Sequence, residues 1–556
     1  MINYNDPVEI WKAYERGKEY KDSIDLFETV EQNERFYVGD QWHGLNAPNI
    51  TKPVLNHIKR STSIVVAKVC ADDIAANIVP FVQNEETEKK VKIIRGEVNK
   101  IIELCDLKSM GKLCVRNAAV DGDGCVYTYW DAEAETGQDS KGMVAAEIIE
   151  NTKVFFANPY TTAVQGQRYI IISRRLPVGD VRERAEANKV KQLEEIVSDT
   201  EMNQGAIQLD DGLCTLLTVL FKKDGSVHAV EATEKVIVRE EWDTELKRYP
   251  VAWLPWEPQR ESMHGRAMIT DMIPNQIAIN KAYAGLIRVI ERMGFPIMIL
   301  NGQFVPKNEK GERKWNGQPG SIMDVTGAPG DVRQYATYLE GAPINPSISG
   351  IIDNIATQTR ETMGTNDASS GNVRPENTSA IIALQNTDTV PLELNRQTYN
   401  GFMEDIVRNI VDMIAANYGK RQTTMQVTDP TTKKVNEQVT EFDFDDLDYA
   451  NLRISVDIGA ASMWSEITQM DAINAIFTSG IMQDLNKFKL YLEVIPDKYL
   501  NAKAKLLAWV EEQMAAYQQP QQLTDPNQQQ TNEPYGGMPM EYNNAPTIAQ
   551  EGYPNV

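Results

Sequence analysis

A stretch of apolar residues between positions 268 and 293 constrains the fold of this chain more than any other feature. The segment reads MITDMIPNQIAINKAYAGLIRVIERM, and its large apolar side chains recur at the spacing of a helix. They form two neighbouring stripes: Ile273, Ile277, Ala284 and Ile287, and Ile279, Tyr283, Leu286 and Ile290. A helix that is apolar around so much of its circumference has packing partners on more than one side. Gly294 ends the predicted helix.

The chain is long and acidic. Its 556 residues suffice for several domains or one large elaborated domain, and the 42% apolar share supports a real core. The formal net charge of -23 argues against a surface that grips nucleic acid, because phosphate binding needs Lys and Arg. The negative charge is compatible with a protein along which DNA slides, because a surface that binds phosphates tightly would hinder that movement.

Cysteine usage and the apolar runs bear on location. The five cysteines include no CxxC pair, which argues against a zinc site or a disulfide framework and favours a reducing compartment. The first residues, MINYNDPVEIW, lack the basic and apolar regions of a secretory signal. The longest apolar runs are far too short to span a bilayer. We therefore expect a soluble protein that is made in a cytosol and has no membrane partner.

The first half of the chain mixes helical and strand patterns. Helices are predicted over 7–38, 54–79 (ended by Pro80) and 85–120, the last broken near Asp106. After Asp121-Gly-Asp-Gly124 the pattern becomes that of one sheet. Its predicted strands cover 125–130, 144–149, 154–159, 168–173, 213–222, 227–232 and 235–239, with a polar helix over 178–198 between them. The predicted fold class is therefore α+β.

The second half alternates helices with polar segments. A short strand over 295–300 precedes a region rich in Gly, Pro and Lys, residues 301–344, which predicts small strands and turns. Asn345-Pro346 begins a second helix, because Asn is a cap residue and Pro suits the first helical position. Gly364 ends that helix, and a polar loop follows it.

Pro375 then opens a very long predicted helix that runs to about Tyr418, with a kink expected at Pro391. Strands are predicted within 425–458, and two or three helices follow. The remainder after Tyr517 is rich in Gln, Asn and Pro, and its composition predicts disorder.

The sequence contains no clear enzyme motif. GxSxG, a P-loop and a convincing GxGxxG are all missing, so we expect no catalytic residue, no cofactor and no metal. The four histidines lack metal-site spacing and are predicted to be structural or exposed: His43, His57, His228 and His264. Asp121-Gly-Asp-Gly124 lacks the further oxygen ligands of a calcium loop, because Cys125 and Ala132 occupy those positions. It predicts a turn between a helix and a strand.

One acidic cluster leaves an enzymatic alternative open. Its members are Asp443, Asp445, Asp446 and Asp448. Such carboxylates can hold Mg²⁺ in a nuclease. The alternating Phe442, Phe444 and Leu447 favour instead a strand or loop whose carboxylates lie in water.

The order of the predicted elements and several short motifs resemble the portal proteins of tailed bacteriophages. An α+β half leads into a long helix, a small Gly- and Pro-rich module, a return helix, a polar loop and a very long kinked helix. The motifs that match the family in order are Phe36-Tyr-Val-Gly-Asp-Gln-Trp42, Asn56 with the helix after it, Gly122–Asp131, Phe155–Pro159, Tyr249–Pro255 with Gly265, and Ser379–Gln385. The resemblance extends over about residues 30–500.

The resemblance implies a portal-like subunit with an α/β wing, a two-helix stem, a small β-rich clip and a helical crown. The implied regions are an N-terminal wing part (1–267), a stem helix and strand (268–300), the clip (301–344), a return stem helix (345–364), a tunnel loop (365–377), the long kinked helix with the rest of the wing (378–497), the crown (498–516) and a disordered tail (517–556).

The resemblance also implies a non-enzymatic function in the virion, with assembly in the host cytoplasm. About twelve copies would form a ring at one capsid vertex and pass double-stranded DNA during packaging, retention and ejection. The implied partners are other copies of the chain, the major capsid and scaffolding proteins, the terminase large subunit, which supplies the ATPase, and head-completion or adaptor proteins. The alternatives are another connector or adaptor of the virion, against which the length argues, and the Mg²⁺-dependent nuclease.

Two groups of residues are implied to line the DNA channel. The tunnel loop would be small and polar, with Asn366, Asp367, Ser369, Ser370, Gly371, Asn372 and Arg374. Repeated around a ring, Lys281, Arg288 and Arg292 would form belts of positive charge in the channel wall.

Overall fold

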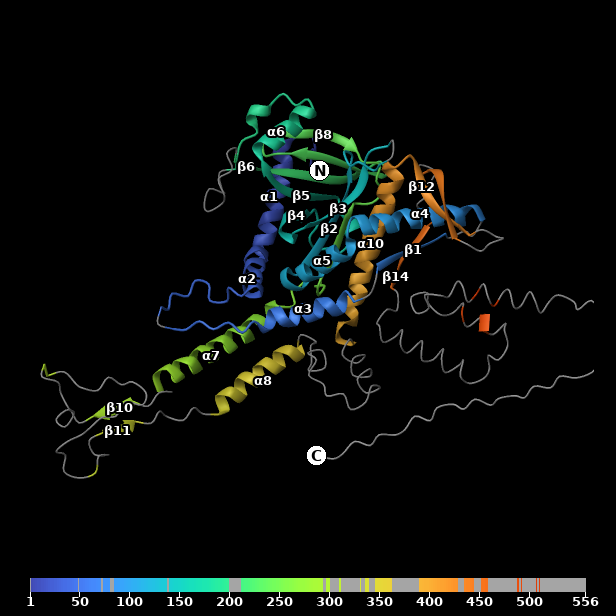
Figure 1. The fold of residues 1–556 in the computed structure, drawn as a ribbon. Helices are drawn as coiled ribbons and strands as arrows, with labels where there is room; N and C mark the ends of the chain where they lie inside the picture. The colour runs from blue at the N-terminus through green and yellow to red at the C-terminus, as the bar shows by residue number, and fades with distance from the viewer. Residues whose placement is uncertain are drawn as a thin grey trace, which may run out of the picture. The chain divides into compact units, whose positions relative to one another are not determined.

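The computed structural model confirms the α+β class, because helices and antiparallel strands are both abundant and are mixed along the chain (Figure 1). The chain divides into a unit from Met1 to Glu466 and a second unit from Ile467 to Val556, and every element named below belongs to the first. The structure describes residues 2–48, 50–71, 74–80, 85–137, 140–199, 212–293, 297–300, 310–311, 331, 336–339, 346–362, 390–428, 435–444, 452–458 and a few single positions after them.

Three helices begin the chain. α1 (Pro7–Ser23) starts after Asp6, whose side chain accepts a hydrogen bond from the Val8 N–H. α2 (Leu26–Val38) is a separate helix, so the single helix predicted over 7–38 is wrong at its centre. The cause is Asp25, whose φ of 53° is left-handed and interrupts the helical backbone. α3 (His57–Val69) is capped by Asn56, which accepts a hydrogen bond from the Lys59 N–H at 2.9 Å.

The helix predicted to continue up to Pro80 is wrong beyond Val69. Residues Ile74–Pro80 form strand β1, which pairs antiparallel with β14 (Leu452–Ile458). The partner strand comes from far along the chain, and such tertiary pairing overrides a local preference for helix.

A three-stranded sheet lies against the next helices. α4 (Glu85–Leu104) and α5 (Leu107–Asp121) are separated at the left-handed Asp106, which confirms the predicted break. α5 packs on β2 (Asp123–Asp131), the central strand of the order β3–β2–β9. β3 (Met143–Ile149) is the partner predicted for β2, whereas β9 (Val251–Pro255) was not predicted as a strand.

The remaining strands of this half form a second sheet, so the single sheet predicted from the sequence is wrong. Its order is β4 (Val154–Phe156), β5 (Tyr169–Pro177), β6 (Leu213–Lys223), β7 (Ser226–Ala232) and β8 (Ile237–Asp243). The chain changes sheets at η1 (Asn151–Lys153), where the buried Lys21 donates hydrogen bonds of 2.6 Å to the carbonyls of Asn151 and Val154. α6 (Val178–Ala187) is shorter than the helix predicted over 178–198.

A helical excursion follows the second sheet (Figure 1). η5 (Thr270–Met272) leads into α7 (Ile273–Met293), which is followed by β10 (Ile297–Leu300). β10 pairs antiparallel with β11 (Ala336–Leu339), and α8 (Pro346–Thr362) then returns beside α7. Both helices predicted from the sequence are confirmed here. No helix in the described part of the chain is long and apolar enough to cross a membrane.

α10 (Glu393–Asn417) completes the main core. It packs on β9, β2 and β14, and it buries Phe402, Ile406 and Ile410. η7 (Val390–Leu392), which contains Pro391, precedes α10 directly. Residues 363–389 lie outside the described residues, so the kink at Pro391 stays a prediction. β12 (Lys420–Thr428) and β13 (Val435–Asp443) pair antiparallel, in agreement with the strands predicted for this region.

Candidate functional site

The site that the structure assembles most completely is the base of α7, where the segment between α2 and α3 docks on the helix. Gly39 ends α2 with a left-handed φ of 103°, which turns the following residues away from the helix axis. Gln41 then donates a hydrogen bond to the Phe36 carbonyl at 2.9 Å, and Trp42 donates one to the Pro53 carbonyl at 2.9 Å. These bonds fix the shape of the segment that contacts α7.

Three buried amide side chains join this segment to the helix, and we call Gln41, Gln276 and Asn280 the amide network. Asn280 donates to Gln41 Oε1 at 2.6 Å. Gln276 donates to Asn280 Oδ1 at 3.0 Å and to the Leu55 carbonyl at 2.7 Å, and its own Oε1 accepts the His57 N–H at 3.2 Å.

Burial gives the amide network its strength. Gln276 is 0% exposed and Asn280 is 3% exposed, and residues four apart lie on the same face of a helix. A buried amide that loses its partner leaves another polar group unsatisfied, so the bonds hold or fail together. The network therefore fixes the base of α7 against the ends of α2 and α3.

Apolar packing reinforces the same junction. A compact cluster lies beside the amide network: Phe36, Ile58, Val120, Ile269, Met272 and Ile273. Asn33 of α2 donates a hydrogen bond of 2.8 Å to the Val120 carbonyl and one of 2.9 Å to Thr270 Oγ1. The start of α7 thus contacts α2, α3 and α5 through both polar and apolar groups.

A second buried pair fixes the chain just before α7. Asp123 Oδ2 lies 2.8 Å from His264 Nδ1, and Asp123 Oδ1 accepts the Gly265 N–H at 2.7 Å. The side chains of Asp123 and His264 are 0% and 5% exposed. Gly122 has a φ of 99°, and a Cβ there would lie 2.6 Å from the Gly265 carbonyl oxygen, so this close approach requires glycine.

This pair was missed by sequence reasoning, which predicted only a turn at Asp121-Gly-Asp-Gly124 and a structural or exposed His264. The turn is confirmed, because Gly122 ends α5 and Asp123 begins β2. The available signal was an Asp between two glycines at the start of an otherwise apolar strand, where a buried carboxylate needs a partner.

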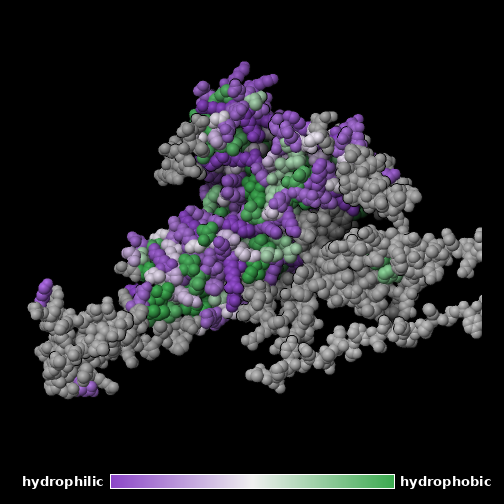
Figure 2. Space-filling model, viewed as in Figure 1, coloured by the Kyte–Doolittle hydropathy of each residue, from purple (hydrophilic) through white to green (hydrophobic). Residues whose placement is uncertain are grey.

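The other end of α7 is uncovered. After Ala284, no described side chain of α7 is buried, and the apolar Leu286, Ile287 and Val289 are only partly covered. Ile290 is 43% exposed, and Ile351 of α8 is 58% exposed. Figure 2 shows hydrophobic residues between hydrophilic ones on the surface of this part of the unit. The wide apolar surface predicted for this helix is therefore only partly used within the chain.

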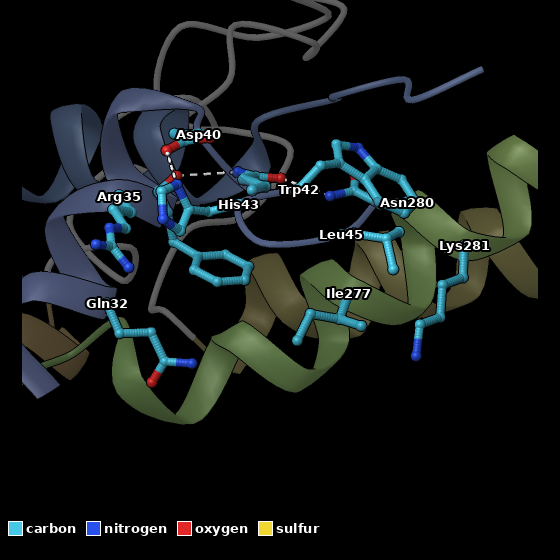
Figure 3. Close-up of a pocket in the computed structure, with 11 residues that line it drawn as sticks. Gln32, Arg35, Asp40, Trp42, His43, Leu45, Ile277, Asn280 and Lys281 are labelled. Atoms are coloured by element: carbon cyan, nitrogen blue, oxygen red, sulfur yellow. Dashed lines mark hydrogen bonds and ion pairs between the residues drawn. The ribbon is translucent and has the colours of Figure 1, made fainter. Parts of the chain in front are cut away.

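A cavity of about 310 Å³ lies between the docked segment and α7 (Figure 3). Asp40, His43 and Leu45 line one side, and Ile277 and Lys281 of α7 line the other. His43 Nδ1 lies 2.9 Å from Asp40 Oδ2, and both side chains are more than half exposed.

The channel residues predicted from the sequence are only partly described. Lys281 and Arg288 are exposed on α7, and Arg292 belongs to the same helix, although its side chain lies outside the described residues. The predicted tunnel loop (365–377), with Asn366, Asp367, Ser369, Ser370, Gly371, Asn372 and Arg374, lies outside them too. So do the tail (517–556) and nearly all of the predicted clip (301–344) and crown (498–516).

The acidic cluster of the nuclease alternative is described at one position. Asp443 ends β13, and its Oδ2 lies 3.7 Å from Lys420 Nζ. Asp445, Asp446 and Asp448 lie outside the described residues. Within the described ranges, no group of three or more His, Cys, Asp or Glu residues could hold a metal ion. The described cysteines are free thiols, and burial raises the pKa of Cys114 to about 12.

Asp121, the last residue of α5, has a carboxyl group whose pKa is raised. Burial is the main cause that raises the pKa of its carboxyl from 3.8 to about 7; Arg116 lowers the pKa, and the carboxylates of Glu34 and Glu150 make smaller raising contributions. Its Oδ1 is buried and has no hydrogen-bond partner in the described part of the chain.

Breaking the amide network should loosen the base of α7. Asn280→Leu removes the donor to Gln41 and the acceptor of Gln276, and we expect it to lower the free energy of unfolding by about 1–3 kcal/mol. Thermal unfolding and hydrogen exchange of the α7 amides measure the effect. Asn275→Leu is the matched control, since it makes the same substitution on the same helix outside the network. Equal shifts for the two variants would contradict the assignment.

Asp121 should make stability depend on pH. The folded state keeps the Asp121 proton up to about pH 7, whereas the unfolded state releases it near 3.8, so the folded state binds more protons between these values. Stability from this group is therefore lost as the pH rises through that window. Chemical unfolding of Asp121→Asn and the wild type should show an advantage of the variant that grows from about pH 4 to about pH 8. Parallel pH curves would contradict the raised pKa.

Comparison with known proteins adds no relative: no protein-family model matches the sequence, and no curated protein matches it either. The function is therefore inferred from the residues and contacts of the chain itself.

Proposed function

We propose that this chain is one subunit of a phage portal, a ring at one capsid vertex through which double-stranded DNA enters and leaves. The observation that carries the proposal is the excursion of α7, β10, β11 and α8. Its base is fixed by the amide network, while its far part leaves apolar side chains in water.

The exposed apolar surface of α7 and α8 would be buried favourably by a binding partner. Burying such surface is favourable by about 25 cal/mol per Å². Groups of apolar side chains that stay exposed on a folded chain mark interaction sites. A repeated contact between different faces forms a ring when the rotation between copies closes. The order of elements along the chain adds support, since an α+β part precedes the excursion and α10 follows it.

The charge of the chain fits a channel wall rather than a DNA-gripping surface. A net charge of -23 per subunit repels phosphates, which lets DNA move without adhering. The polar segment from Asn366 to Arg374 is proposed to contact the moving DNA. Lys281 and Arg288 lie on the exposed side of α7. In a ring, this side faces either the channel or a neighbouring subunit.

In the proposed portal, partner proteins carry out the enzymatic steps. In it, a terminase large subunit supplies ATP hydrolysis, and capsid, scaffolding and head-completion or adaptor proteins bind the ring from outside. The chain itself is proposed to have no catalytic residue and to act in the virion after assembly in the host cytoplasm.

Polar substitution of the exposed apolar residues should prevent ring assembly and leave the subunit folded. We expect the double variant Ile290→Asp, Ile351→Asp to remain monomeric in native mass spectrometry while its thermal unfolding stays close to wild type, because both side chains are already exposed in the monomer. Val8→Asp, Val197→Asp is the matched control, since it replaces two similarly exposed apolar residues of other elements. Rings of normal size from the Ile290 and Ile351 variant would contradict the assignment of this surface.

A further inference from the structure

The free side of α7 carries small and basic residues. Ala278, Lys281, Gly285 and Arg288 are exposed, whereas Gln276, Asn280 and Ala284 are buried. Successive residues of a helix are about 100° apart, which places Ala278, Lys281 and Gly285 across the helix from Gln276 and Asn280. Arg288 lies at the edge of this exposed side, four residues after the buried Ala284. This side of α7 is therefore turned away from the rest of its own chain.

The free side of α8 carries small and acidic residues. Gly350, Asp353, Asn354 and Glu361 are exposed, and the buried Ile352 and Thr359 lie on the opposite side of the helix. α8 packs beside α7 and contacts α3, so its acidic side is also turned away from its own chain.

The two glycines have no explanation within the chain. A Cβ at Gly285 or at Gly350 would meet nothing within 4 Å, and neither residue has the positive φ that would require glycine. Glycine weakens a helix relative to alanine. Gly285 follows Ala284, the last buried residue among the described side chains of α7, and Gly350 lies just before the first described buried residue of α8. Both glycines thus mark the level where contacts within the chain end and a close approach from outside is possible.

The charges of the two free sides are complementary. Lys281 and Arg288 lie on α7, and Asp353 and Glu361 lie on α8. None of these four side chains takes part in an ion pair between described residues of the same chain. Opposite charges on two faces of one molecule favour a head-to-tail contact between copies.

We propose that the free side of α7 in one copy docks on the free side of α8 in the next copy. Lys281 and Arg288 pair with Asp353 and Glu361 of the adjacent copy, and the two glycines let the helices approach closely. The inference rests on the proposed ring and names its contact. DNA is a poorer occupant, because phosphates would suit only the basic side and would leave the acidic side of α8 without a partner.

Charge reversal tests this contact in the full chain. The first variant carries Lys281→Glu and Arg288→Glu, and the second carries Asp353→Lys and Glu361→Lys. Each alone brings like charges together in the contact, so we expect the ring species to be lost in native mass spectrometry. An equimolar mixture of the two variants restores opposite charges at every contact and should form rings that contain equal numbers of each. A single chain with all four substitutions should assemble with itself.

Controls separate this contact from general effects of charge. Lys191→Glu, Arg260→Glu makes the same change in net charge at exposed sites on other parts of the surface and should leave the rings intact. Thermal unfolding of every variant monomer should match that of the wild type, since all four positions are exposed.

Three outcomes would overturn the inference in distinguishable ways. Normal rings from both reversed variants would refute this contact and leave the proposed ring standing. Normal rings from the first variant, with loss of binding to a double-stranded DNA probe, would assign the basic side to DNA instead. A wild type that forms no rings would refute the proposed function and this inference together.

Discussion

The buried amide network at the base of α7 is the interaction on which the rest of the account depends. Gln276 and Asn280 are buried. Their side chains form hydrogen bonds with Gln41, the Leu55 carbonyl and the His57 N–H. All of these hydrogen bonds form together in only one arrangement of α2, α3 and α7. If α7 shifted by one turn, its buried amides would lose their hydrogen-bond partners. The direction in which α7 leaves the sheets is fixed by this requirement.

Because the base of α7 is fixed, the far part of the excursion stays exposed to water. If α7 and α8 could fold back, their apolar side chains would find cover within the chain. Held at the base, they present Ile290 and Ile351 to water together with a basic side and an acidic side. Apolar surface supplies affinity, and complementary charge supplies register and direction. A subunit built in this way is suited to a repeated head-to-tail contact, which is the contact that a closed ring needs.

The sequence predicts local features of this fold well and its long-range pairings poorly. Apolar periodicity and end signals located α7 and α8, and the left-handed Asp106 separated α4 from α5 as expected. The same periodicity misassigned Ile74–Pro80, because only its distant partner β14 makes it a strand. The motif from Phe36 to Trp42 was noticed only through resemblance. Its contact with Asn280 depends on tertiary packing, as does the pairing of Asp123 with His264, so neither follows from spacing along the chain.

Ring formation is tested by the mass of the purified full-length protein at micromolar concentration, measured by native mass spectrometry together with negative-stain imaging. We expect closed rings of about twelve subunits with a central hole, since the excursion exposes a head-to-tail contact on every copy. A species that stays monomeric or dimeric across concentration and ionic strength would contradict this expectation, because the uncovered sides of α7 and α8 would then have no partner of their own kind.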